Sequence, residues 1–297
     1  MESVIETEGL TKQWGPLTAV DDINLRIPAG ECYAYLGLNG AGKSTTARML
    51  LDFIRTTRGT IRVLGGHGSD PSVRARMGYL PGDLNLPRAM TGSDAIAFFG
   101  GLEGSRRRVD PQPLIERFRL DPSRPFRELS TGNRRKVGLV LAFMTDPDLL
   151  ILDEPTSGLD PLLQEDFRDL LAERKAAGAT IWLTSHVMAE VERVADRVGL
   201  VREGRLAREL TMTELRHQAS GQIRLAFPRS VEADRFARVP HVTDAQGQDG
   251  ELLLTVDGPV TEVLQRAAEL GATGIETEQR DLDDIFLEMY QEDGDER

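Results

Sequence analysis

The sequence predicts an α/β fold for most of the chain, followed by a smaller α+β unit. Two apolar runs, 31–36 and 149–152, are typical of central strands in a parallel sheet, which are buried on both faces. A glycine-rich turn and a helical pattern follow the first run, in the alternation that builds such sheets. The composition changes near residue 212: residues 213–297 hold 8 Arg, no Lys and 19 Asp plus Glu, which is −11 of the chain's net charge of −12.

A P-loop motif lies between the first predicted strand and a helix. The turn matches the pattern G-x-x-x-x-G-K-[ST], whose glycines let consecutive backbone N–H groups close on a phosphate. The helix N-terminus adds partial positive charge. We expect Lys43 to reach the β- and γ-phosphates of a nucleotide and the Ser44 hydroxyl to bind Mg²⁺. The candidate phosphate-binding residues are Gly37, Leu38, Asn39, Gly40, Ala41, Gly42, Lys43, Ser44 and Thr45.

Two carboxylates, Asp153 and Glu154, follow the second predicted strand. Open α/β sheets bind ligands at the carboxyl ends of their strands, so both acids should lie beside the P-loop. Asp153 is the expected Mg²⁺ ligand. By strand alternation Glu154 should point elsewhere, toward the γ-phosphate and an attacking water, which makes it the expected general base. The alternative is two surface acids that merely end a strand.

A short Ser/Gly turn, Leu129–Lys136, precedes a helix predicted from Val137 to about Thr145. The Ser130 hydroxyl and the N–H groups of Thr131 and Gly132 are suited to bind an anion, as helix N-termini do. An ordinary serine N-cap would have the same sequence, so this turn indicates an anion site only in combination with the P-loop and the two carboxylates.

The order of P-loop, Ser/Gly turn and paired carboxylates resembles the ATP-binding subunit of ABC transporters. The family's turn usually reads Leu-Ser-Gly-Gly-Gln, whereas Thr131 and Asn133 stand at its third and fifth positions here. The resemblance implies a RecA-like P-loop ATPase core over residues 1–212, with an antiparallel β-subdomain and a helical subdomain at about 85–130. It also implies that two copies dimerise head to tail on ATP and Mg²⁺, each P-loop facing the other's Ser130–Asn133 turn.

Three further positions match this family. The segment Ser157–Asp160 is similar to the D-loop, which communicates across the dimer, and Asp160 is included among the expected nucleotide contacts. His186 matches the switch histidine that contacts the γ-phosphate. Trp14 occupies the place of the aromatic residue that stacks on adenine. A surface or capping role for His186 and a core position for Trp14 are the alternatives.

One position departs from the family pattern. Gly82 stands where the family normally has a glutamine that helps to hold Mg²⁺ and couples the nucleotide to the membrane subunit. Because Gly82 has no side chain to offer, the neighbouring Asp83 is the hypothetical replacement as an oxygen ligand of Mg²⁺. The alternative is that Asp83 belongs only to a docking loop.

The composition fits a protein that meets the membrane only through a partner. No apolar stretch approaches the ~18 residues that a membrane span requires. The N-terminus lacks the basic and apolar regions of a secretory signal, and the single Cys32 fits a reducing cytosol. The resemblance implies a cytoplasmic subunit, peripheral on the inner face of the cell membrane, without direct membrane insertion. A separate permease would dock near Gly82–Thr91 and the helical subdomain.

The acidic C-terminal unit, residues 213–297, has the pattern of a small ferredoxin-like α+β module. A closing helix, Asp281–Tyr290, ends in a segment that resembles the C-terminal extension of efflux-type ABC ATPases, which favours export. The sequence leaves the role of this unit open. The predicted elements are the strand Gln222–Phe227, the helix Val231–Ala237, the strands Val242–Ala245 and Leu252–Val256, the helix Val260–Leu270 and the strand Gly274–Glu278.

Other ATPase classes fit less well. Lys43 and Ser130 are 87 positions apart, which leaves no room for the long coiled coil of chromosome-structuring and repair ATPases. The single P-loop disfavours the translation-associated type, and a P-loop kinase would have no such Ser/Gly turn. The acidic C-terminal unit argues against a nucleic-acid partner. A soluble ABC-type ATPase without a permease stays the alternative function, and the transported substrate cannot be inferred because its contacts would lie in the permease.

Overall fold

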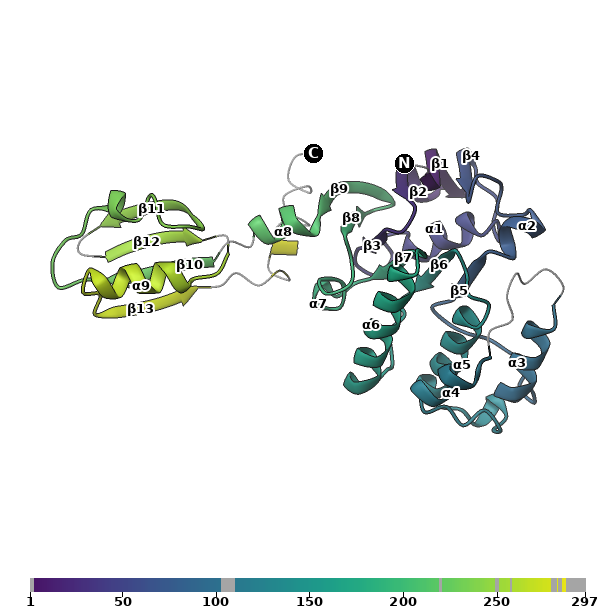
Figure 1. Cartoon of the computed structure of the whole chain (residues 1–297). Coiled ribbons are helices and arrows are strands. Elements are labelled where there is room, and N and C mark those ends of the chain that lie inside the picture. Colours follow the sequence, from purple (N-terminus) through teal and green to yellow (C-terminus); the bar gives the residue numbers. More distant parts are fainter. Residues whose placement is uncertain are drawn as a thin grey trace. The chain divides into compact units, whose positions relative to one another are not determined.

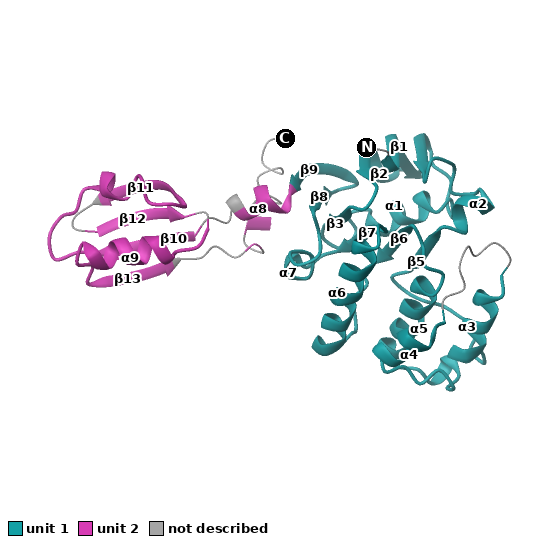
Figure 2. Cartoon of the chain, in the orientation of Figure 1, with its two compact units in different colours: residues 1–210 teal, residues 211–297 magenta. Residues whose placement is uncertain are grey.

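The computed structural model describes residues 3–102, 110–218, 221–248, 251–256 and 258–278, together with Leu282, Ile285 and Phe286. The chain divides into two compact units, residues 1–210 and 211–297, which are coloured separately in Figure 2. Each unit has a hydrophobic core of its own.

A six-stranded sheet forms the centre of the first unit (Figure 1), in the order β5-β6-β7-β3-β8-β9. The four pairings from β5 to β8 are parallel. Every residue of β3, β6 and β7 is buried, as their consecutive apolar residues predict. The strands are β3 (Cys32–Leu36), β5 (Met77–Leu80), β6 (Leu149–Asp153), β7 (Thr180–Ser185), β8 (Arg197–Arg202) and β9 (Arg205–Thr211).

An antiparallel sheet of order β2-β1-β4 confirms the expected β-subdomain at the start of the chain. It consists of β1 (Ser3–Trp14), β2 (Leu17–Pro28) and β4 (Arg58–Val63). Its apolar side chains, among them Ile5 and Leu10, share a core with the helix α1 (Lys43–Leu50). Trp14 ends β1 and pairs with Leu17 across a tight turn, so the sheet presents this indole at its margin.

The chain between β5 and β6 supplies the helices of the helical subdomain. These are α3 (Gly92–Gly100), α4 (Gln112–Arg117), a short 3₁₀ helix (Phe126–Glu128) and α5 (Thr131–Phe143). A capping box fixes the start of α3, since the Thr91 hydroxyl accepts from the N–H of Asp94 and the Asp94 carboxylate accepts from the N–H of Thr91. The remaining helices of the first unit are α2 (Pro71–Arg74), α6 (Pro161–Ala176) and α7 (Met188–Val191).

The helix α5 begins six residues earlier than the predicted Val137, directly after Ser130. The prediction was wrong because the charged run Arg134–Lys136 shows no apolar stripe, although such residues form helices well. α5 packs on β5 with almost no spacing: a Cβ at Gly78 would lie 2.2 Å from the carbonyl oxygen of Ala142, and a Cβ at Gly138 would lie 2.6 Å from Cδ1 of Leu80. Glycine at both positions lets the helix touch the strand.

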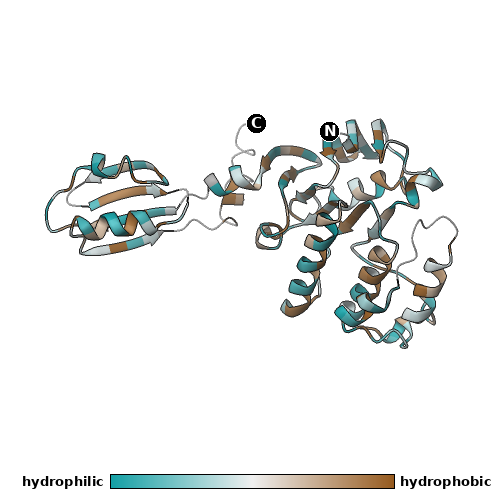
Figure 3. Ribbon diagram, in the orientation of Figure 1, coloured by the Kyte–Doolittle hydropathy of each residue, from teal (hydrophilic) through white to brown (hydrophobic). Residues whose placement is uncertain are grey.

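The second unit contains a four-stranded antiparallel sheet of order β11-β12-β10-β13. Its strands are β10 (Gly221–Ala226), β11 (Val242–Gln248), β12 (Glu251–Val256) and β13 (Gly274–Glu278), joined by α9 (Thr261–Glu269) and preceded by α8 (Met212–Gln218). The strand β12, brown in Figure 3, contributes Leu252, Leu254 and Val256 to the core. The assignment of this unit to the ferredoxin-like fold stays a prediction.

The helix predicted at Val231–Ala237 was wrong. The chain forms only a 3₁₀ turn, Ala233–Arg235, whose hydrogen bonds join residues three apart, such as the N–H of Phe236 to the carbonyl of Ala233. A seven-residue segment is too short for a stable α-helix on propensity alone, and the fully buried Phe236 anchors the tighter turn instead.

The predicted closing helix Asp281–Tyr290 falls largely outside the described residues. Three of its positions, Leu282, Ile285 and Phe286, are helical and buried, whereas Met289 and Tyr290 are not described. Among the described residues no helix combines the length and the apolar character needed to cross a bilayer.

Candidate functional site

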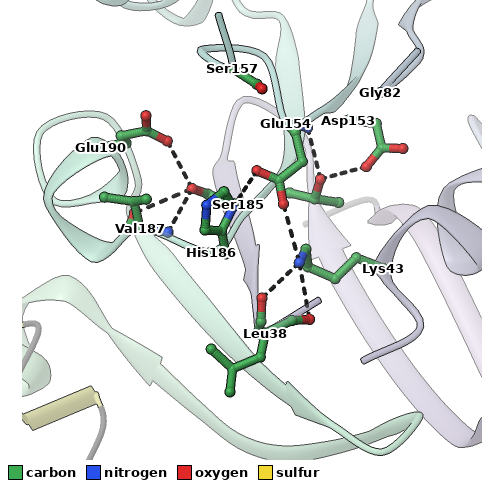
Figure 4. Close-up of polar contacts among 12 residues, drawn as sticks. Leu38, Lys43, Gly82, Asp153, Glu154, Ser157, Ser185, His186, Val187 and Glu190 are labelled. Atoms are coloured by element: carbon green, nitrogen blue, oxygen red, sulfur yellow. Dashed lines mark hydrogen bonds and ion pairs between the residues drawn. The ribbon is translucent and has the colours of Figure 1, made fainter. Parts of the chain in front are cut away.

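The carboxyl ends of β3, β6 and β7 bring four of the predicted site residues to one edge of the central sheet (Figure 4): Lys43, Asp153, Glu154 and His186. The strand register pairs Leu36 with Ser185 and Asp153 with Thr184. The P-loop leaves β3 at this edge, the two carboxylates end β6, and His186 directly follows β7. Three segments far apart in the sequence therefore meet where parallel sheets bind ligands.

The P-loop is held between β2 and β8 at positions where only glycine fits. Gly42 has a φ of +102°, and a Cβ there would lie 2.5 Å from the carbonyl oxygen of Ala19. A Cβ at Gly37 would lie 2.4 Å from the carbonyl oxygen of Val201. Because α1 begins at Lys43, its unpaired N–H groups open toward the loop, which gives the geometry of a phosphate site.

Lys43 places a buried positive charge at the centre of the site. Its ammonium group donates to the carbonyl oxygens of Gly37 at 2.7 Å and Leu38 at 3.3 Å. Its Nζ also lies 3.1 Å from Oε1 of Glu154. With only 6% of the side chain exposed, these three oxygens compensate for the water that the ammonium group has lost.

Glu154 connects Lys43 with His186, as Figure 4 shows. Its second carboxylate oxygen, Oε2, lies 2.7 Å from Nδ1 of His186. A carboxylate only accepts hydrogen bonds, so Nδ1 carries the proton in this contact. The structure thus joins the three residues predicted to be catalytic in one connected group.

The backbone of Glu154 lies in the left-handed region, with a φ of +50°, which is uncommon outside glycine. Its N–H donates to the Thr184 hydroxyl at 2.9 Å, and that hydroxyl donates to Oδ1 of Asp153 at 2.7 Å. β6 ends at Asp153, so this turn, rather than the strand alternation we expected, directs the two neighbouring carboxylates to different partners. The Thr184 hydroxyl thus holds the Asp153 carboxylate and the backbone of Glu154.

Replacing Thr184 with valine is expected to weaken the site and the fold together. The buried Asp153 carboxylate would lose a donor and the Glu154 N–H an acceptor, which should lower the free energy of unfolding by about 1–3 kcal/mol. Urea unfolding followed by tryptophan fluorescence measures this loss in the first unit, since both tryptophans, Trp14 and Trp182, lie there. Thr184→Ser retains the hydroxyl and should stay near wild type; equal stability of the valine and serine variants would contradict the prediction.

The loop after β5 passes directly beside Asp153. A Cβ at Gly82 would lie 3.1 Å from Oδ2 of Asp153, so the loop position without a side chain adjoins the expected Mg²⁺ ligand. Asp83 is exposed, and its role as a ligand stays a prediction. Within the described part of the chain, no group of three or more His, Cys, Asp or Glu side chains is arranged to hold a metal.

The Ser130–Asn133 turn forms the N-terminus of α5. The Ser130 hydroxyl accepts from the N–H of Asn133 at 3.3 Å, so it caps the helix in this structure. A Cβ at Gly132 would lie 2.7 Å from the carbonyl oxygen of Gly158, which brings the turn against the D-loop of the same chain. Asp160 in turn caps α6, where its carboxylate accepts from the N–H of Leu163 at 3.1 Å.

Trp14 stands apart from the phosphate-binding residues, at the margin of the β-subdomain. Its side chain is 50% exposed, which argues against a core role, and the Nζ of Lys12 lies 4.1 Å from the ring centroid. Among the described residues, neither Trp14 nor the Ser130–Asn133 turn shares a hydrogen bond or ion pair with Lys43, Glu154 or His186.

Two contacts around the site escaped the sequence interpretation. The Ser185 hydroxyl donates to the Glu190 carboxylate at 2.9 Å and accepts from the N–H of Val187 at 3.0 Å, which fixes the backbone around His186. Arg135 lies buried in α5, and burial lowers the pKa of its guanidinium group. Nothing in the sequence indicated the contacts of Ser185. The burial of Arg135 was not expected either, because this residue lies in a run of charged residues.

Comparisons with known proteins point to one family. A family model described as ABC transporter matches residues 20–157. The chain is 32% identical to the bacitracin transport ATP-binding protein BcrA of Enterococcus faecalis, over 97% of each chain. It is 34% identical to the daunorubicin/doxorubicin resistance ATP-binding protein DrrA of Streptomyces peucetius, over 99% of this chain and 94% of that protein.

Solved structures agree with these sequence matches. An ATP-binding subunit of an ABC transporter covers 73% of this chain, with 31% identity and a TM-score of 0.65, and 93% of that subunit is matched. A bacterial ABC transporter cassette solved as a dimer covers 70% of this chain and is itself matched over 98%, with 22% identity and a TM-score of 0.63. The second likeness concerns the fold alone.

Proposed function

Because the chain belongs to the family of ABC transporter ATP-binding proteins, we propose that it drives export through a membrane permease encoded as a separate chain. ATP binding and hydrolysis coupled to transport are properties of this family. The observation that carries the assignment to catalysis is the connected group of Lys43, Glu154 and His186 beside Asp153. The roles of single residues, the metal, the dimer and the permease are parts of the proposal.

In the proposed site, ATP lies with its phosphates in the loop Gly37–Ser44 and its adenine on Trp14. The γ-phosphate replaces the Glu154 carboxylate as the counter-charge of Lys43. Trp14 supports this arrangement because half of its side chain is exposed and offers an aromatic face to a purine.

Mg²⁺ fits the donor set at this edge. Asp153 is 2% exposed, its Oδ1 is held by Thr184, and its Oδ2 faces the loop at Gly82. In phosphate sites Mg²⁺ binds a small number of hard oxygen ligands from the protein, and the Asp153 carboxylate and the Ser44 hydroxyl would supply them here. When bound, the metal would neutralise charge on the β- and γ-phosphates.

Glu154 acts as the general base in hydrolysis. Released from Lys43 by the γ-phosphate, its Oε1 accepts a proton from water as the water oxygen attacks the γ-phosphorus and the bond to ADP breaks. His186 remains hydrogen-bonded to Oε2 and orients the carboxylate. The left-handed turn at Glu154 supports this role, because it aims the carboxylate along the P-loop edge.

Two copies of the chain complete the site head to tail. The N-terminus of α5, a helix of 13 residues, offers the N–H groups of Thr131 and Gly132 to the γ-phosphate bound by the other copy. Contact between this turn and Gly158 supports communication with the D-loop. The solved dimeric cassette shares only the fold, so the homodimer is an inference from the exposed turn.

The names of three relatives support export. BcrA is named for bacitracin transport, DrrA for daunorubicin/doxorubicin resistance, and a protein of Paraburkholderia xenovorans, 40% identical over 69% of each chain, for Nod factor export. We infer that this chain works at the inner face of the cell membrane, with the permease docked near Gly82–Thr91. The acidic net charge of −12 supports a protein partner over nucleic acid.

Glu154→Gln tests the shared site. Removing the base while keeping the side-chain shape should let ATP bind without being consumed, so the variant should elute as a dimer from size exclusion with Mg-ATP and as a monomer without it. The matched control is Glu165→Gln on α6, where an exposed glutamate pairs with Arg168, and it should show no stable dimer. A Glu154→Gln monomer that still hydrolyses ATP at the wild-type rate would refute both the base and the two-copy site.

A further inference from the structure

Arg135 is a buried arginine whose guanidinium group, among the described residues, donates to backbone carbonyl oxygens alone. Nη1 donates to Pro81 at 2.7 Å and to Asp153 at 3.4 Å, Nη2 donates to Gly82 at 2.8 Å, and Nε donates to Ser157 at 3.3 Å. The residue is 7% exposed. One planar fork therefore joins three separate segments of the chain.

The charge of Arg135 is costly where it lies. Burial is the main cause that lowers its pKa, and the carboxylates of Asp153, Glu154 and Asp83 act in the opposite direction from a distance. Within the described part of the chain its guanidinium group forms no ion pair. A buried arginine of this kind adds little to the stability of the protein through its charge. The contribution of Arg135 therefore lies in its hydrogen bonds to the three segments.

These three segments are the ones that border the proposed nucleotide site. Pro81 and Gly82 form the loop beside the Asp153 carboxylate, Asp153 ends β6, and Ser157 opens the D-loop. Arg135 itself lies in the second turn of α5, one helical turn from the Ser130 cap. Arg135 therefore connects the expected Mg²⁺ ligand Asp153 with α5, the helix whose N-terminal turn would complete the nucleotide site of the second copy.

α5 packs along β5 from Arg135 to Ala142. Ala142 lies over Gly78, Gly138 over Leu80, and Arg135 reaches Pro81 at the end of the strand. These helix positions are spaced so that they share one face. A displacement of the loop at 81–82 must therefore be felt by α5 and by the turn at its N-terminus.

We propose that Arg135 is a positioning residue that fixes the signature turn Ser130–Asn133 relative to the loop at Pro81–Gly82 and to the D-loop. The inference rests on the proposed two-copy site. The family's glutamine side chain is missing at Gly82, and in this chain a side chain from α5 holds the Gly82 carbonyl instead. Arg135 contacts neither nucleotide nor water in the reaction; it acts through the three segments that do.

Arg135→Gln and Arg135→Lys in the full-length chain test the position by steady-state kinetics. Both should lower kcat about 10- to 100-fold, since misplacement by about 1 Å costs that much, while the KM for ATP stays near wild type because the P-loop is untouched. Lysine keeps the charge but has no planar fork for carbonyls in several directions. Full activity of Arg135→Lys would overturn the proposed geometry.

The matched control is Arg117→Gln. Arg117 also joins the helical subdomain to the core, through a bidentate contact with Glu173 on α6 in which Nη1 donates to Oε2 at 2.8 Å. Glu173 lies 13 residues beyond the D-loop residue Asp160, which is about 20 Å along the helix. Its kcat should match wild type. An equal loss of kcat in Arg117→Gln and Arg135→Gln would show that any loosened subdomain has this effect and would overturn the inference.

A second measurement places Arg135→Gln in the Glu154→Gln background. Glu154→Gln alone should dimerise with Mg-ATP, whereas the double variant should bind ATP, followed by tryptophan fluorescence, yet remain monomeric. If Arg135 only stabilised the fold, its loss would lower the melting temperature of the double variant. It would not abolish dimerisation while ATP binding and the melting temperature stay unchanged. A double variant that dimerises like Glu154→Gln would overturn the inference. Failure of Glu154→Gln itself to dimerise would instead count against the proposed function, and the kinetics of the single Arg135 variants would then decide on Arg135.

Discussion

Lys43→Ala is expected to abolish ATP hydrolysis, with kcat/KM falling on the order of 10³-fold, as when a preorganised charge-stabilising donor is removed. The ammonium group is already held by the carbonyls of Gly37 and Leu38 in the phosphate-binding loop, so the variant removes the positive charge that is placed there. Without Lys43, the Glu154 carboxylate also loses its cationic neighbour at 3.1 Å. Phosphate release from ATP and binding of a fluorescent ATP analogue measure the two consequences.

Lys175→Ala is the control for this variant. Lys175 also forms an ion pair, with Asp196, but lies in the last turn of α6 and serves no phosphate site. Its turnover should equal that of wild type. Lys43→Arg should fail as Lys43→Ala does, because a guanidinium group is too large for the place of a compact ammonium. ATP turnover at the wild-type rate in Lys43→Ala would contradict the assignment of the P-loop lysine.

Glu154→Gln should lower kcat about 10²- to 10⁴-fold, the range ascribed to a general base, while ATP binding is kept. The amide has nearly the shape of the carboxylate, and the Glu154 N–H keeps its bond to Thr184, so the left-handed turn should persist. Single-turnover hydrolysis separates the chemical step from product release and is the measurement to make. Glu154→Asp serves as the companion variant.

Aspartate retains the carboxylate one methylene further back, out of reach of both Lys43 and His186 at their present distances. It should therefore show a rate between those of wild type and Glu154→Gln. If Glu154→Gln retained the wild-type single-turnover rate, another group would have to take the proton and the catalytic role of Glu154 would be wrong.

Local patterns determined how much of this protein the sequence predicts. The strands β3 and β6 and the P-loop can be predicted from consecutive residues, because a buried parallel strand needs an apolar run and a phosphate loop needs its glycines. The predicted strand Gly274–Glu278 agrees in its bounds with β13. The 3₁₀ turn at Ala233–Arg235 was missed because seven residues carry too little periodicity to distinguish it from a helix.

The contacts that join these segments were not predictable. Thr184 ends an apolar run, and nothing in its neighbours indicates that its hydroxyl would hold both Asp153 and Glu154 across the strand register. Arg135 sits 54 residues from Pro81 in the sequence, and only the packing of α5 on β5 brings its fork to that carbonyl. Such contacts depend on the register between strands and on helix placement, which a single sequence does not display.

The two close contacts between α5 and β5, at Gly78 and Gly138, also determine which parts of such chains are free to diverge. Gly78 faces a carbonyl oxygen at a distance that excludes any side chain, whereas a side chain at Gly138 would require the Leu80 side chain to move, so we expect lineages that keep the site to keep glycine at position 78 and a small residue at position 138. The segment 92–128, which holds α3, α4 and the 3₁₀ helix, lies outside these two contacts and holds none of the residues assigned to the proposed site. Lineages can therefore remodel that segment to suit new permeases while inheriting the ATP-driven machinery unaltered.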